Sequence, residues 1–165
     1  MCFIVVLFRL NSNSSVLDKF KYEKLTNFCA YSERCRKDVA EKCRKLEIPQ
    51  EEFSAYLQLL EEDGFLSEKR YAASFVRSKA NRSWGPKKIE MGLKAKGISV
   101  EVFQPLIEDL QKPLLIEKMQ VLIDRKVKSI KGETASDRKQ KLIRFLLGKG
   151  FAYDLIKEAI GTRSF

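Results

Sequence analysis

Apolar residues recur at intervals of three and four along most of the chain, which is the spacing of an amphipathic helix. Three segments share one such pattern: Val39–Leu57, Ile89–Ile107 and Leu142–Ile160. When they are aligned, the apolar residues coincide in four sets: Val39, Ile89 and Leu142; Cys43, Leu93 and Leu146; Ile48, Ile98 and Phe151; Phe53, Phe103 and Ile156. A match in residue type without identity indicates one supersecondary unit used three times.

Each aligned segment has room for one more helix before it. The apolar face of the first such helix is formed by Leu25, Phe28, Cys29 and Tyr31. Ser67 is a natural N-cap for the second, and Pro113 is acceptable in the first turn of the third. The pattern therefore predicts about nine helices in three three-helix units.

We expect an all-α, elongated fold of three tandem, helix-turn-helix-like repeats. The repeats are predicted at residues 18–66, 67–111 and 112–165, after an N-terminal extension and linker at residues 1–17. Met1–Phe8 suits a short strand or a disordered extension, and it is too short to span a membrane. Because no secretory leader is recognisable, we expect a cytoplasmic protein.

One helix has both of its ends specified by sequence. Pro86 suits the first helical position, which makes Gly85 the N-cap. Gly97 is expected to end the helix in the left-handed conformation, with Ile98 packing back on Leu93. Just before this helix, Trp84 has two interpretations: it packs against the preceding helix, or it stacks on a nucleic-acid base.

Charge is distributed unevenly over the 165 residues, whose formal net charge is +10. Residues 1–65 carry −1, residues 66–110 carry +4, and residues 111–165 carry +7. Such regional asymmetry favours a polyanionic partner (nucleic acid, a nucleoprotein or an acidic protein surface) over solubility alone.

The candidate contacts for that partner are Lys and Arg residues of the second and third repeats. They are Arg77, Lys79, Arg82, Lys87, Lys88, Lys94, Lys96, Lys126, Lys128, Arg138, Lys139, Lys141, Arg144 and Lys149.

Catalytic and metal-binding signals are weak. The chain has no histidine, and its four cysteines form no C-x-x-C pair, so we expect buried free thiols and no metal or cofactor. No phosphate-binding loop or nucleophile elbow is present. The acidic segment Glu61–Phe65 could hold a metal with Glu51 and Glu52, but the solvated end of a helix is the simpler interpretation. We therefore expect a protein that is not an enzyme.

The segment Leu59–Ile98 resembles the signature region of the RecX family of bacterial RecA regulators. The similarity rests on Gly64-Phe65-Leu66, Tyr71-Ala72, Phe75-Val76, Gly85, Ile89, Leu93 and Gly97-Ile98. It extends over roughly Tyr22 to Ile160, although Ser67-Glu68 stands where the family more often has two acidic residues.

This resemblance implies a protein that lies in the groove of the RecA–single-stranded-DNA filament and inhibits recombinase and co-protease activity in the SOS response. It implies no cofactor and no membrane, and we expect a monomer. Two alternatives remain: a helical module that binds DNA or RNA directly, and an adaptor for another acidic protein.

Overall fold

The computed structural model describes residues 17–132 and 134–161. Within these ranges the regular elements are helices, and no strand occurs. The elements are α1 (Lys19–Tyr31), α2 (Arg36–Lys45), the short 3₁₀ helix η1 (Gln50–Glu52), α3 (Phe53–Glu62), α4 (Glu68–Asn81), α5 (Pro86–Ala95), α6 (Val100–Glu108), α7 (Lys112–Val127), α8 (Ala135–Gly148) and α9 (Tyr153–Ile160). The all-α prediction is confirmed; the N-terminal strand or extension lies outside the described residues.

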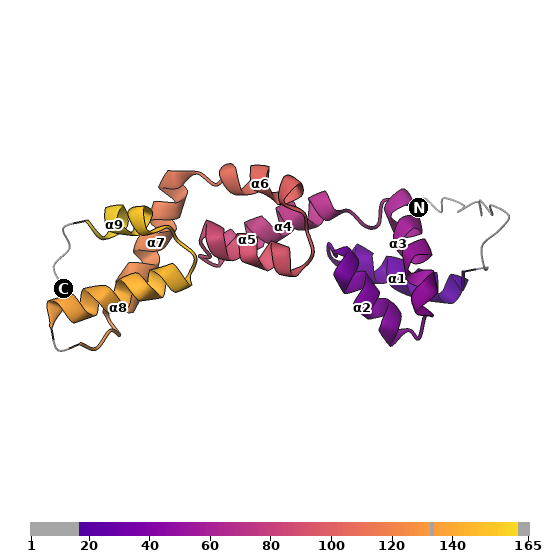
Figure 1. Ribbon diagram of the computed structural model, residues 1–165, viewed down its shortest axis with the longest axis horizontal. Coiled ribbons are helices and arrows are strands. Elements are labelled where there is room, and N and C mark those ends of the chain that lie inside the picture. The colour runs from indigo at the N-terminus through magenta and orange to yellow at the C-terminus, as the bar shows by residue number, and fades with distance from the viewer. Residues whose placement is uncertain (1–16, 133, 162–165) are drawn as a thin grey trace.

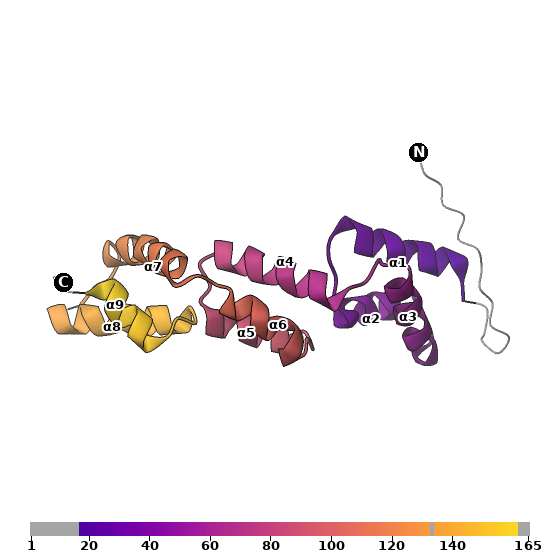
Figure 2. The same cartoon turned by 90° about the horizontal axis from the view of Figure 1, so that it is seen from above.

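The helices form three successive groups along the longest axis of an elongated molecule (Figures 1 and 2). Each group, α1–α3, α4–α6 and α7–α9, surrounds its own cluster of buried side chains. Every apolar position of the sequence alignment is buried, including the large residues Phe103 and Phe151. The repeat predicted from hydrophobic spacing is therefore the repeat of the cores.

The predicted helix ends are also confirmed. Gly85 is the N-cap of α5 and Pro86 is its first residue. Gly97 has a φ of +80°, and the Ile98 N–H donates to the Leu93 carbonyl at 3.1 Å. At the start of α4, the Ser67 side chain accepts a hydrogen bond from the Arg70 N–H.

One local expectation changes and another is confirmed. Tyr31 is 87% exposed, because α1 buries Leu25 and Cys29 and turns its last residue toward solvent. The acidic segment is the solvated end of α3, as expected, and its residues are exposed. Within it, Glu61 pairs with Arg36 at 3.1 Å, and Asp63 accepts a hydrogen bond from the Tyr22 hydroxyl. Burial, together with this carboxylate, raises the pKa of Tyr22.

The first and second helical groups meet through one buried thiol and several polar contacts. Cys35, at the N-cap of α2, is fully buried in the cluster of the second group. Around it, Lys96 pairs with Asp38 at 2.7 Å and Arg70 pairs with Glu33 at 2.9 Å. This first junction is therefore held mainly by side chains, several of them partly exposed.

Candidate interface for an anionic partner

The predicted basic residues divide into those that form an ion pair with a described residue and those that do not. Lys94, Lys96 and Lys141 pair with Glu90, Asp38 and Asp137. Arg138 forms no ion pair but donates to the neutral Gly132 carbonyl. The others form no ion pair with a described residue: Arg77, Lys79, Arg82, Lys87, Lys88, Lys126, Lys128, Lys139, Arg144 and Lys149. These unpaired cations are the ones free to attract an external anion.

Some of the unpaired lysines lie over aromatic rings. The Lys79 Nζ is 5.0 Å from the Phe75 ring centroid and 4.8 Å from that of Trp84, and the Lys88 Nζ is 4.8 Å from the same tryptophan ring. Trp84 is half-buried and packs against the second core, so the packing interpretation describes its position. Its ring also fixes two ammonium groups at the surface.

A second group of the same kind surrounds Phe145 of α8, with Lys126 coming from α7 and Lys149 from the C-cap of α8. Lys126 and Lys149 place their Nζ atoms 5.3 Å and 5.4 Å from the Phe145 ring centroid. Each such cation–π contact contributes about 0.5–1 kcal/mol at an exposed site, which is enough to restrict a flexible lysine without removing its charge. All four ring-bound lysines are half-buried, whereas Arg82, Lys87, Lys128, Lys139 and Arg144 are exposed.

The two groups of lysines and rings come together where the start of α5 contacts the turn between α8 and α9 (Figures 1 and 2). The Gly85 N–H donates to the Lys149 carbonyl at 2.7 Å, and the Lys87 N–H donates to the Gly150 carbonyl at 3.1 Å. These bonds satisfy N–H groups that the first turn of a helix leaves without a partner. A Cβ at position 85 would lie 2.4 Å from the carbonyl carbon of Gly150, so only glycine permits this approach.

The surroundings of Lys88 account for one of the two cations in the first turn of α5, where the helix dipole disfavours positive charge. The Lys88 ammonium lies 3.4 Å from the Gly148 carbonyl and over the Trp84 ring, so nearby acceptors offset the unfavourable position. We call the set Phe75, Lys79, Trp84, Lys88, Lys126, Phe145 and Lys149 the junction strip. It places fixed, unneutralised charge across two helical groups, as binding to a run of phosphates or carboxylates requires.

The described residues offer little for other chemistry. Cys29, Cys35 and Cys43 are buried free thiols, and burial raises the pKa of Cys29 to about 11, which keeps it protonated at neutral pH. Residues 17–132 and 134–161 contain no group of three His, Cys, Asp or Glu residues able to hold a metal ion. No helix in that part of the chain is long and apolar enough to cross a membrane.

Comparison with known proteins shows which family has this architecture. Residues 67–104 match the family model for the second three-helix domain of RecX, and residues 116–160 match the model for the third. The crystal structure of RecX from Lactobacillus salivarius is 30% identical, with a TM-score of 0.73 and coverage of 86% of this chain and 92% of that one. The chain belongs to the RecX family. A second RecX crystal structure, 23% identical, has a TM-score of 0.78 and supports the fold.

Curated relatives agree with the family assignment. The regulatory protein RecX of Clostridium botulinum strain Alaska E43 is 33% identical over 130 residues, which cover 77% of this chain and 60% of that protein. The RecX of Bacillus cytotoxicus is 28% identical over 137 residues, covering 82% and 51%. The chain thus spans between half and two thirds of the length of these relatives.

The four lysines of the junction strip are among the predicted contact residues, but the rings that hold them, Phe75 and Phe145, are not. A usable signal was present, because Phe75–Lys79, Trp84–Lys88 and Phe145–Lys149 are all aromatic–lysine pairs four residues apart. Residues at that spacing are neighbours on one helix face. The contact between the start of α5 and the turn after α8 has no such signal in the sequence, because Gly85 and Gly150 are far apart along the chain.

Proposed function

We propose that this RecX-family chain binds a RecA-type recombinase filament on single-stranded DNA and inhibits its recombinase and co-protease activities. The observation that carries the proposal is the junction strip, whose lysines have no carboxylate partner and are fixed on aromatic rings. A filament presents phosphates and acidic side chains in a regular array. An elongated row of helical groups offers a long surface to such an array.

In this proposal the chain acts as a monomer and needs no reaction of its own. The second and third helical groups make the main contacts through the strip and the neighbouring unpaired cations. The first group mainly supports the fold, because residues 1–65 carry a net charge of −1 and Arg36 is paired with Glu61.

The test is a charge reversal in the strip, Lys79→Glu with Lys88→Glu. Filaments are assembled with the recombinase of the same bacterium on immobilised oligo(dT), with a non-hydrolysable ATP analogue, and affinity is measured at several salt concentrations. We expect binding at 0.1 M salt to weaken by about tenfold or more, which corresponds to about 1.4 kcal/mol. The slope of log K against log salt should fall by about 1.4, since each single-strand phosphate contact contributes about 0.7.

The matched control is Lys24→Glu with Lys42→Glu. These lysines also lie over phenylalanine rings, Phe20 and Phe28, but belong to the first helical group. The control changes the net charge equally and should bind within about threefold of the wild type. Equal losses in the two variants would show that only net charge matters. Preferential binding of the wild type to one naked duplex sequence would favour the direct DNA-binding alternative.

A further inference from the structure

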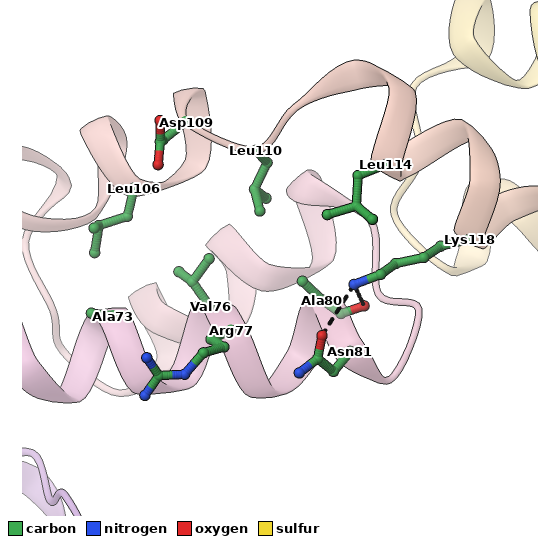
Figure 3. Close-up of a pocket in the computed structure, with 10 residues that line it drawn as sticks. All are labelled: Ala73, Val76, Arg77, Ala80, Asn81, Leu106, Asp109, Leu110, Leu114 and Lys118. Atoms are coloured by element: carbon green, nitrogen blue, oxygen red, sulfur yellow. Dashed lines mark hydrogen bonds between the residues drawn. The ribbon is translucent and has the colours of Figure 1, made fainter.

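A groove of about 260 Å³ lies between α4, the end of α6 and the start of α7 (Figure 3). Its floor is formed by α4, where Ala73 and Ala80 are too small to fill the space. Above them, Leu106 of α6, Leu110 of the following turn and Leu114 of α7 extend toward α4 (Figure 3). An apolar cavity of about 150 Å³ accommodates a benzene ring, so this groove has room for a large apolar side chain.

The rim of the groove carries excess positive charge. Arg77 is exposed and forms no ion pair with a described residue. The Lys118 Nζ lies 3.1 Å from both the Ala80 carbonyl and the Asn81 Oδ1, which are neutral acceptors that leave its charge uncompensated. One carboxylate, Asp109, is among the lining residues, and it lies at the C-cap of α6, across the groove from Arg77 (Figure 3).

The groove is separate from the junction strip. On α4 the groove residues Ala73, Val76 and Ala80 follow each other at helical spacing, while the strip residues Phe75 and Lys79 occupy another face. At 3.6 residues per turn, the centres of the two faces are about 110° apart. One helix therefore presents two chemically different surfaces to its surroundings.

We propose that the groove binds a segment of the recombinase protein in which a leucine- or phenylalanine-sized side chain is followed closely by a carboxylate. The apolar side chain enters between the leucines and the alanines, and the carboxylate pairs with Arg77 at the rim. This inference rests on the proposed function, because it names the protein part of the filament as the occupant. The strip contacts the polyanion and the groove contacts the protein.

The test is to fill the groove with Ala73→Leu, which adds no charge and leaves the strip intact. We expect filament affinity to fall by about tenfold or more, with binding to naked oligo(dT) unchanged within about twofold. Thermal unfolding should match or exceed that of the wild type, since the new side chain enters an open apolar space. Ala30→Leu, at an exposed position on α1, is the matched control and should leave filament binding unchanged.

A second variant, Arg77→Glu, tests the carboxylate. Arg77 is exposed, and its replacement should reduce filament affinity by a similar factor at 0.1 M salt, with a smaller loss at high salt. If the wild type binds the filament and both variants bind equally well, the groove inference is overturned while the proposed function stands. If the wild type itself does not bind the filament, the proposed function fails and the inference fails with it.

Discussion

The backbone at residue 47 shows the cost of a side chain at a repeated turn. The first helical group carries Glu47 where the other two carry Gly97 and Gly150, and all three have positive φ: 53°, 80° and 89°. A left-handed conformation costs a non-glycine residue about 1–2 kcal/mol. The turn keeps its geometry because Ile48 is buried beside it and the Ile48 N–H donates to the Cys43 carbonyl at 3.1 Å.

Replacing Glu47 by glycine should therefore stabilise the protein. We expect a gain of about 0.5–1 kcal/mol, which is less than the strain because glycine also increases the entropy of the unfolded chain. The Glu47 carbonyl, which accepts from Lys21, remains in the variant. Urea unfolding measures the gain, with Gly97→Ala as the opposite case; lower stability of Glu47→Gly would contradict the argument.

Asp38 and Lys96 form the pair that makes the first junction sensitive to pH. Burial raises the pKa of Asp38, but hydrogen bonds from Lys96 and Cys35 outweigh it and hold the pKa below its ordinary value. The hydrogen bond to Asp38 raises the pKa of Lys96. The stabilisation from Asp38 is thus present above its unfolded-state pKa, about 3.9, and is lost as pH falls through the folded pKa.

Asp38→Asn should consequently lower stability at pH 7 and have less effect near pH 3. Since Lys96 is more than a third exposed, we expect a loss of about 1 kcal/mol or less at pH 7. Thermal unfolding of both proteins from pH 3 to pH 8 tests this. A difference between them that does not shrink toward low pH would show that the pair is not its origin.

At the scale of helices, local sequence specifies the ends and the buried faces, while contacts between groups depend on the assembled fold. Ser67, Pro86 and Gly97 act within one turn of their positions, so their roles can be predicted from neighbouring residues. Cys35 looks like an ordinary residue before a helix, yet it is buried in the next group's core. Backbone contacts across a long sequence separation leave no periodic signal.

The contact between Gly85 and Gly150 should be essential for the junction between the second and third helical groups. Gly85→Ala places a Cβ 2.4 Å from the opposing backbone, and relief requires the two helical groups to move apart. We expect a destabilisation of about 1–3 kcal/mol, the usual range for overpacking. Trp84 fluorescence, adjacent to the contact, should report the movement during urea unfolding.

Gly148→Ala is the matched control for that variant. Gly148 is the last residue of α8, and a Cβ there would meet nothing within 4 Å. Its replacement should be neutral or stabilising by up to about 1 kcal/mol, because alanine favours the helix. Equal destabilisation by the two substitutions would rule out close approach of the backbones as the cause.

At the scale of the whole molecule, the sequence predicts the sign and the region of the charge. It does not predict which cations remain available to an anionic partner. Lys96 and Lys141 are neutralised by carboxylates, while Lys79 and Lys149 remain unpaired over aromatic rings. The difference arises from packing between helices and could not be predicted from composition. The resulting molecule is an elongated row of helical groups with positive charge where the second and third groups meet.

Titration of the protein into recombinase on single-stranded DNA, with ATP hydrolysis followed over time, tests the main conclusion most directly. We expect hydrolysis to fall as protein is added, and Lys79→Glu with Lys88→Glu to require about tenfold more protein for the same effect. A decline at protein concentrations well below that of the recombinase would indicate action at few filament sites. A decline only near equimolar protein would indicate binding along the length of the filament. Unchanged hydrolysis at every ratio would contradict a role in regulating the filament.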